Sequence, residues 1–455
     1  MLSTTSEAAD AFIAAHPEIE FVDGIFADLC GIIRGKRYPI EDLNKIMTKG
    51  ITIPASVFLL SVTGSTHDPL GMGISDGDPD HLLVPVPGML KPVRWAERPL
   101  AQVYMTMRNP QGEPSWIDPR NVLARVVQRF TDMGLTPVVA LELEFYLIDK
   151  KRTRLGAPRP PISPRSKQRE TATQVYSITE LEAFAGLLAD ITAACDVQEI
   201  PYGAITTEYA PGQFEINLDH VADPLLAADH AVLLKRVVKG CARRHDLQAT
   251  FAPKPFPEES GSGLHAHISL IDTEGRNVLD DGAGGPNALL RHAIGGCLEM
   301  MPASMALFAP SPNGFRRYRA NNFVPVSRCW GIENRSAAVR VPMGDAASRR
   351  IEHRIAGADA NPYLALAGIL ASMHHGIQQK IDPGPPSTGN LGMEVDPAIP
   401  NRPYRALDVM QASPVLQDYF GADYVEAYVT TKRAEMDEFY EQLSPTEYAW
   451  YLQAD

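Results

Sequence analysis

Apolar and acidic residues alternate in one short stretch of the chain. Between Leu141 and Phe145 the sequence reads Leu-Glu-Leu-Glu-Phe, and the preceding run, Pro137–Ala140, is apolar and rich in valine. Successive side chains of a β-strand point to opposite faces, so the pattern predicts a central strand with Glu142 and Glu144 on one face. Two adjacent carboxylates repel each other, and burying either one alone is costly. We therefore interpret them as ligands of a cation, while a solvated strand face is the ordinary alternative.

The first hundred residues or so predict a small α+β unit. The spacing of apolar residues predicts helices at Ser6–His16 and Glu41–Thr48, the first with Ser6 as its N-cap. It predicts strands at Phe21–Ala27, Ile32–Tyr38 and Leu100–Met107. The first two strands form a predicted hairpin, and the last ends at the turn Asn109–Gly112. The acidic stretch Ser75–Asp80 lacks the spacing of a calcium-binding EF-hand and is predicted to be a loop.

Long helices dominate the predicted elements after residue 115. Their apolar spacing places them at Asp118–Met133, Ile178–Asp196, Asp223–Asp246, Ala360–Gly376 and Ala422–Gln442. Asp118 and Pro119 are typical of a helix start, as cap and first helical residue. The segment Lys150–Arg169 is basic and proline-rich, but it lacks the interleaved aromatic residues of a nucleic-acid site. We interpret it as a solvated loop, and the Pro/Gly-rich segment Pro383–Pro403 as another.

Two further sets of polar residues recur at strand spacing. Glu208 and Glu215 flank a Pro-Gly turn that could fold both carboxylates towards one point. A glycine-rich turn precedes His265, His267 and Ser269, which share one face of a predicted strand. Imidazoles can ligate cations, although a histidine in such a place is as often a satisfied core residue.

Arginines cluster in the last third of the chain. Arg350, Glu352 and Arg354 alternate on one predicted strand face, and other arginines precede them at positions 316, 317, 319, 335 and 340. Guanidinium groups bind carboxylates and phosphates through paired hydrogen bonds. The pattern therefore indicates a site for anions, with a structural ion-pair network as the alternative.

Composition narrows the class of protein. The chain has 455 residues, so two or more domains are expected, and its net charge of −13 argues against nucleic acid as the main partner. The five cysteines are scattered and odd in number, as is typical of a reduced, cytoplasmic protein. The N-terminus has no signal-peptide pattern and no apolar run has the length of a membrane span, so no membrane partner is expected.

Together these motifs resemble those of the glutamine synthetase family. Five occur in the family's order: Glu142-x-Glu144; Glu208 with Gly212-Gln213-x-Glu215; Gly261-Ser262-Gly263-Leu264-His265-x-His267; Asn334-Arg335-Ser336 with Arg340-x-Pro342; and Arg350-Ile351-Glu352-x-Arg354 with Asn361-Pro362-Tyr363. The resemblance implies an α+β fold with a small β-grasp-like domain over residues 1–115. A large catalytic domain that binds ATP and glutamate would follow over residues 116–455, with a curved antiparallel sheet and flanking helices. Family members form stacked rings with active sites between subunits, so a homo-oligomer is implied.

The resemblance also implies a role for each motif residue. One divalent ion, on the amine and glutamate side, would be held by Glu144, Glu208 and Glu215; a second, on the nucleotide phosphates, by Glu142, His265 and Glu352. Six ligands of which five are carboxylates suit Mg²⁺ or Mn²⁺ rather than zinc. Residues matching positions near ATP are His267, Ser269, Arg340 and Arg350. Residues matching positions that grip glutamate and the transferring phosphoryl group are Arg317, Arg335 and Arg354, and Gly261 matches a backbone contact to glutamate.

The chemistry that the resemblance implies accounts for these residue types. ATP would phosphorylate the γ-carboxyl of L-glutamate, and an amine would then displace phosphate. Transfer of a phosphoryl group between anions needs positive charge in fixed positions, which two metal ions and arginines supply. A carboxylate such as Glu208 is suited to remove the proton from the amine.

Departures from the family pattern bear on the amine. Ammonia-using members carry a Phe-Asp-Gly-Ser-Ser stretch where this chain reads Pro54-Ala55-Ser56-Val57-Phe58, and a flap glutamate where it has Phe323. Loss of two acidic groups weakens a site for ammonium, and Phe323 could pack against an alkyl chain. A Gly at position 392 replaces the tyrosine that some bacteria adenylylate, so that control should be absent.

These departures resemble the γ-glutamylpolyamine synthetase branch, which ligates glutamate to a polyamine or a diamine such as putrescine. The alternatives are a ligase for ammonia, ethanolamine, a monoamine or an aromatic amine, and a non-catalytic relative. The sequence leaves open the amine itself, the ring size, the choice between Mg²⁺ and Mn²⁺, and other regulation.

Overall fold

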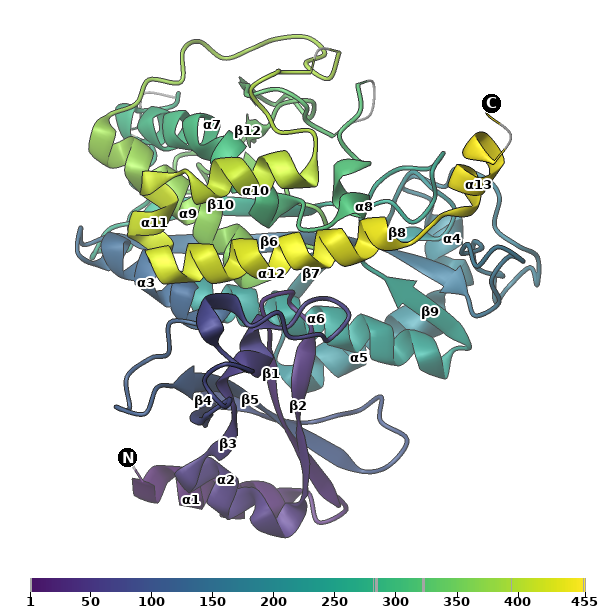
Figure 1. Ribbon diagram of the computed structural model, residues 1–455, viewed down its shortest axis with the longest axis vertical. Helices are drawn as coiled ribbons and strands as arrows, with labels where there is room; N and C mark the ends of the chain where they lie inside the picture. Colours follow the sequence, from purple (N-terminus) through teal and green to yellow (C-terminus); the bar gives the residue numbers. More distant parts are fainter. Residues whose placement is uncertain are drawn as a thin grey trace.

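A five-stranded sheet is the centre of the N-terminal part of the chain, which lies at the bottom of Figure 1. The computed structural model describes residues 2–280, 282, 285–320, 324–393, 395–452 and 454. The strand order is β2-β1-β5-β4-β3, with β1 and β5 parallel and the other pairs antiparallel. The strands are β1 Phe21–Ala27, β2 Ile33–Pro39, β3 Ile51–Pro54, β4 Asp80–Pro92 and β5 Leu100–Arg108. The helices are α1 Leu2–Ala15 and α2 Leu43–Lys49, with 3₁₀ turns at Ile40–Asp42, Ala55–Leu59 and Pro69–Gly71.

The structure corrects two details of this region. Helix α1 begins at Leu2, so Ser6 lies inside it and is not its N-cap; its hydroxyl donates to Asn44 on α2 at 3.0 Å. Strand β4 was not expected from the sequence, because its prolines and glycine weaken strand spacing. The predicted acidic loop ends where β4 begins, at Asp80, and Asp76 uses its carboxylate to accept two backbone N–H groups within that loop.

An eight-stranded sheet is the centre of the larger part of the chain. Its order is β11-β12-β13-β10-β6-β8-β7, with β9 paired to β6 beyond the end of β8. Among the described strand pairs of this sheet, only β11 and β12 are parallel. The strands are β6 Thr136–Asp149, β7 Tyr202–Thr207, β8 Gln213–Leu218, β9 Leu247–Thr250, β10 Leu264–Ile271, β11 Trp330–Ile332, β12 Val339–Val341 and β13 Ile351–His353. Strand β6, which carries Glu142 and Glu144, is central, as predicted.

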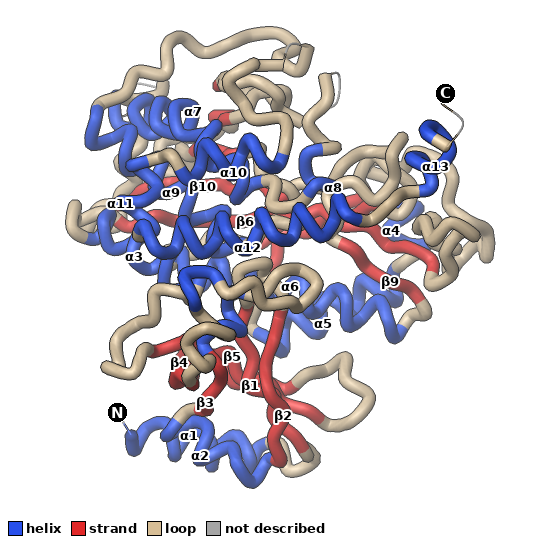
Figure 2. Tube along the Cα trace, viewed as in Figure 1, coloured by secondary structure: helices blue, strands red, loops and turns tan. Residues whose placement is uncertain are grey.

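Helices pack around this sheet, as the colouring of Figure 2 shows. They are α3 Pro119–Thr131, α4 Ile178–Ala183, α5 Ala185–Gln198, α6 Pro224–Arg244, α7 Ala288–Phe308, α8 Pro312–Phe315, α9 Pro362–Gln379, α10 Pro403–Gln411, α11 Pro414–Phe420, α12 Ala422–Glu441 and α13 Pro445–Tyr451. The α+β class expected from the sequence is confirmed. No helix in the described ranges combines the length and the apolar character needed to cross a membrane.

One predicted helix is two. The spacing of apolar residues predicts a single helix over Ile178–Asp196, but the chain leaves helical geometry at Phe184, between α4 and α5. Phe184 is 1% exposed and packs edge-on against Phe214 of β8 at 5.3 Å between ring centroids. The break lets this ring enter the core, a tertiary contact that local periodicity does not register.

Helix α12 joins the two parts of the molecule, crossing the view of Figure 1. Its Thr431 hydroxyl donates to the Leu59 carbonyl at 3.2 Å, and its Glu435 carboxylate accepts the Val62 N–H at 2.9 Å. From the other side, Asn361 at the start of α9 donates to the Asp28 carbonyl at 2.9 Å. The N-terminal sheet is therefore fixed to the part that carries the site.

Candidate active site

Strand pairing brings the acidic residues of β6 to the histidines of β10 and the acid of β8. Glu142 is directly opposite His265 on β10, and Glu144 is directly opposite Glu215 on β8. On the far side of β10, His267 is opposite Glu352 of β13, which is in turn opposite Arg340 of β12. Residues opposite each other on neighbouring strands lie on the same face of the sheet. Segments distant in sequence therefore meet on one face.

Glu142 accepts hydrogen bonds from both histidines. Its carboxylate lies 3.2 Å from His265 Nδ1 and 2.8 Å from His267 Nε2. Burial alone would raise the pKa of Glu142, but these two hydrogen bonds outweigh it and hold the pKa well below its usual range. Arg350 Nε donates to His267 Nδ1 at 3.1 Å. Because that nitrogen must accept, the ring proton is on Nε2 and faces Glu142.

Glu144 is oriented by the glycine-rich turn before β10. One of its oxygens accepts the Gly263 N–H at 2.9 Å and the Gln213 side-chain amide at 3.3 Å. The same amide also donates to the Gly261 carbonyl at 3.0 Å. Gln213 is a site residue that sequence analysis quoted in a motif but gave no role. Its spacing of two from Glu215 on β8 was the available signal.

The two acids of the Pro-Gly turn, Glu208 and Glu215, carry raised pKa values. Burial, and then the charges of Glu144 and Glu142, raise the pKa of Glu208 to about 7. Burial, and then the charges of Glu142, Glu144 and Glu208, raise the pKa of Glu215 well above its usual range. The turn folds as expected, since the Glu208 N–H donates to the Gln213 carbonyl at 2.8 Å. The side chains around these two carboxylates do not supply the positive charge that would keep both of them ionised.

Two groups of side chains could each hold a metal ion. In the described part of the chain they are Glu142 with His265 and Glu352, and Glu144 with Glu215 and His265, each with ligand atoms within 4.8 Å of one another. The first is the set expected from the sequence. The second contains His265 where Glu208 was expected. Glu208 belongs to neither group, although burial, and then the charges of Glu144 and Glu142, raise its pKa. The oxygen-rich donor set and the repelling carboxylates fit a hard divalent cation such as Mg²⁺ or Mn²⁺.

Arginines surround Glu352. Arg340 Nη1 donates to one carboxylate oxygen of Glu352 at 2.7 Å, and Arg354 donates to the other. Burial alone would raise the pKa of Glu352, but Arg354 and then the two histidines lower it to about 2. This carboxylate is 1% exposed, so it stays ionised inside the protein by virtue of these cations.

Arg317 lies among three glycines. A Cβ atom on Gly261 would stand 2.7 Å from its Cγ, and one on Gly263 or Gly357 would stand 3.1 or 3.3 Å from a terminal guanidinium nitrogen. Arg317 is 3% exposed and donates to the Ile355 carbonyl at 3.2 Å. The glycines of the turn therefore make room for a buried guanidinium next to Glu144 and His265.

Three buried arginine N–H groups lack a partner. The Nε atoms of Arg317, Arg340 and Arg354 are buried and make no hydrogen bond within the described residues. A buried donor left unpaired costs free energy, and native proteins rarely retain one without a reason. Anionic groups of a ligand would satisfy all three.

Other predicted site residues lie near this cluster or outside it. Ser269 is on β10, two residues beyond His267, and is 9% exposed. Arg335 is exposed, and its charge acts on Glu208 by lowering its pKa. Phe323 lies outside the described residues. His220, which sequence analysis passed over, places its ring 6.3 Å from that of His267.

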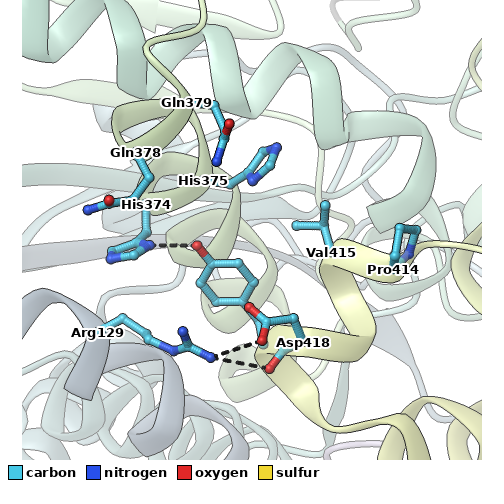
Figure 3. A pocket seen from close by; sticks show the side chains of 9 residues that line it. Arg129, His374, His375, Gln378, Gln379, Pro414, Val415 and Asp418 are labelled. Atoms are coloured by element: carbon cyan, nitrogen blue, oxygen red, sulfur yellow. Dashed lines mark hydrogen bonds and ion pairs between the residues drawn. The ribbon is translucent and has the colours of Figure 1, made fainter.

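A separate cavity of about 440 Å³ lies between α3, α9 and α11 (Figure 3). His374 Nδ1 and the Tyr419 hydroxyl are hydrogen-bonded at 2.5 Å. The Arg129 guanidinium forms an ion pair with Asp418 at 3.2 Å and lies over the Tyr419 ring. These polar groups already pair with one another, as the dashed lines in Figure 3 show. The cavity contains none of the predicted site residues.

Comparison with known proteins bears on this arrangement. The family model described as the glutamine synthetase catalytic domain matches residues 116–451. The chain belongs to the glutamine synthetase family. It is 40% identical to the γ-glutamylputrescine synthetase PuuA of Escherichia coli strain K12, over 99% of this chain and 95% of that protein. It is 30% identical to the glutamate–isopropylamine ligase of a Pseudomonas species, over 93% of each chain.

Solved structures agree with the family. A structure titled apo GmaS without ligand superposes with a TM-score of 0.82 at 27% identity, covering 97% of this chain and 99% of that one. A GmaS complex with ADP gives the same TM-score at 28% identity, covering 98% and 99%. The chain therefore has the glutamine synthetase fold. Enzymes of this family use ATP and divalent metal ions, and the relatives named here are glutamate–amine ligases.

Proposed function

We propose that this chain ligates the γ-carboxyl of L-glutamate to an amine at the expense of ATP, through a γ-glutamyl phosphate intermediate. The observation that carries the proposal is the set of unpaired Nε–H groups on Arg317, Arg340 and Arg354 beside two carboxylate-rich clusters. The arginines of such a site lack anionic partners, and its clustered carboxylates lack cations. A nucleotide with its divalent ions and the glutamate carboxylates would supply both.

The roles follow from position. Glu142, His265 and Glu352 would hold one ion, and Glu144 and Glu215, with Glu208 and His265 beside them, would hold the other. When bound, the two ions screen the phosphate charges and polarise the transferring phosphoryl group. His267, Ser269, Arg340 and Arg350 would lie along the nucleotide. Arg317, Arg335 and Arg354 would hold glutamate and the transferring group, with Gly261 against the glutamate backbone.

This chain's own side chains then carry the steps between ATP and product. The guanidinium groups of Arg317 and Arg354 fix the γ-carboxylate so that one oxygen faces the phosphoryl group, and they neutralise the charge that develops there. Glu208 takes the proton from the incoming amine. A carboxylate within reach of the amine nitrogen is suited to that proton transfer.

Several observations support a diamine or polyamine such as putrescine as the amine. The identity of 40% to a γ-glutamylputrescine synthetase exceeds the 31% to the glutamine synthetase of Pyrococcus horikoshii. The stretch that replaces the ammonium-binding loop, Ala55–Leu59, is a 3₁₀ turn whose Ala55, Phe58 and Leu59 are buried. In the sequence, Phe323 replaces the acidic flap residue of ammonia-using members, which removes a negative charge that would favour ammonium.

The proposal extends to assembly. The N-terminal part, residues 1–115, and the catalytic part, residues 116–455, would form separate domains in a homo-oligomer of stacked rings. Each active site would then lie between the catalytic domain of one subunit and the N-terminal domain of the next. The family membership supports this arrangement.

Phosphate release from ATP and glutamate, measured with a panel of amines, tests the function. We expect release with putrescine to exceed release with ammonia, ethanolamine, isopropylamine or aniline by at least tenfold in kcat/KM, which is about 1.4 kcal/mol. A higher value for a monoamine would favour the second candidate, a glutamate–monoamine ligase, which the 30% identity to the isopropylamine enzyme supports. Absence of release with every amine would contradict both.

A further inference from the structure

Glu333 has a backbone conformation that residues with a side chain rarely adopt. It lies between β11 and β12, with φ at +55°. The left-handed region crowds Cβ against the backbone and is ordinarily left to glycine. Residues that surrounding contacts hold in such a strained backbone conformation cluster at functional sites.

Contacts on both ends of β12 hold Glu333 in this conformation. Its N–H donates to the Val341 carbonyl at 3.1 Å, and its carboxylate accepts from Arg340 Nη2 at 3.2 Å and from the Met343 N–H. The next residue is also fixed, since the Asn334 amide donates to the Gly389 carbonyl at 2.9 Å. The turn therefore aims the Glu333 carboxylate back at Arg340.

Arg340 is held by two carboxylates. Nη1 donates to Glu352 at 2.7 Å, Nη2 donates to Glu333 at 3.2 Å, and the buried Nε–H has no partner within the described ranges. A planar guanidinium fixed at both terminal nitrogens can rotate very little. The guanidinium of Arg340 therefore keeps one orientation beside Glu352.

The two carboxylates are not equivalent. Glu352 is a proposed metal ligand, and both of its oxygens already accept from arginines. A divalent ion would compete with Arg340 for those oxygens, whereas Glu333 belongs to neither group of candidate ligands. Once an ion is bound, Glu333 is the partner that stays with Arg340.

We infer that Glu333 is a positioning residue for nucleotide binding: it holds the Arg340 guanidinium in the one orientation beside Glu352 that the nucleotide site needs. This inference rests on the proposed function, in which Arg340 contacts ATP. Glu333 acts through Arg340 and is not itself a ligand of ATP, glutamate or the metal ions.

Two variants of the full-length protein test the inference. Glu333→Gln keeps the shape of the side chain and removes its charge, and Glu333→Gly removes the side chain while accepting the left-handed backbone. Both should raise KM for ATP, and Kd for ADP measured by calorimetry with Mg²⁺, by about tenfold through loss of a charged hydrogen bond. KM for glutamate should change less than twofold.

A matched control is Glu199→Gly. Glu199 is also a glutamate in the left-handed region, with φ at +54°, and it pairs with Lys91 at 2.5 Å at the end of α5. This variant should leave KM for ATP unchanged. A purely structural role for Glu333 predicts that Glu333→Gly is less stable than the wild type but binds ADP equally well.

Unchanged ADP affinity in both Glu333 variants would overturn the inference, and so would equal increases in KM for ATP and for glutamate. Failure of the proposed function gives a different result, since the wild-type protein would then show no nucleotide binding or no amine-dependent release of phosphate. Selective loss of ADP affinity in the two variants, with the control unaffected, supports the positioning role.

Discussion

Glu144 and Glu215 are directly opposite each other on the antiparallel strands β6 and β8. Like charges in this position destabilise a strand pair, and here both side chains also lie inside the site. The raised pKa of Glu215 expresses the same conflict as a tendency to stay protonated. A bound cation removes the conflict, which is why the metal-free protein should be a less stable form of this molecule.

Divalent ions should therefore stabilise the fold. With free Mg²⁺ or Mn²⁺ at about one hundred times its Kd, the free energy of unfolding should rise by about 2.7 kcal/mol. Glu215→Gln removes one of the opposed carboxylates, so it should raise the melting temperature of the metal-free protein and reduce the shift caused by the ion. Scanning fluorimetry after chelation measures both effects. Glu182→Gln, at an exposed residue paired with Arg165, is the control, and an equal shift in Glu215→Gln would contradict the assignment.

Glu144→Ala should abolish turnover. The change removes a candidate ligand together with the acceptor of the Gly263 N–H and the Gln213 amide. We expect kcat to fall by at least a factor of about 1,000, because metal positioning in phosphoryl transfer is worth several kcal/mol. Size-exclusion chromatography should show the same assembly as the wild type. Measurable activity in a variant that is assembled normally would exclude Glu144 as a ligand.

Arg317→Lys should weaken glutamate binding selectively. Lysine keeps the charge, but it cannot reproduce the planar fork that sits among Gly261, Gly263 and Gly357. We expect KM for glutamate to rise about 10- to 100-fold, the range of a charged hydrogen bond of about 1.5–3 kcal/mol. KM for ATP should move much less. Steady-state kinetics with each substrate varied in turn separates the two, and Arg316→Lys on the same turn is the neighbouring control.

Stability should depend on pH through Glu180, which belongs to neither group of candidate metal ligands. Burial, and then the charge of Glu170, raise the pKa of Glu180 from 4.5 to about 7. Because the folded state holds this proton more tightly than the unfolded state, its contribution to stability is fully present below pH 4.5 and is lost as the pH rises through about 7.

Glu180→Gln should flatten this part of the stability profile. Urea denaturation of the metal-free protein at pH 5.5 and pH 8 measures the difference between the two proteins. We expect the wild type to lose more stability over this interval than the variant. An equal change in the free energy of unfolding between pH 5.5 and pH 8 in both proteins would show that Glu180 does not bind the proton that links stability to pH.

The local sequence pattern was sufficient to predict structure where the conformation of a segment depends on its own residues. The alternation of Glu142 and Glu144 predicted strand β6 and its polar face, and Asp118 caps α3 as its position before Pro119 indicated. It was insufficient where a distant residue decides. The break of the predicted helix at Phe184 depends on Phe214, and the role of Gln213 depends on two partners outside β8.

By itself the sequence determined the candidate site residues and the family, because carboxylates, imidazoles and guanidinium groups at strand spacing can be recognised along the chain. The tertiary structure decided which of them meet. Only strand register puts Glu142 opposite His265 and gives His265 to both candidate ion clusters. The physical reason is that charge pairing acts through space over a few ångströms, whereas these partners are separated by long stretches of chain that the sheet alone brings together.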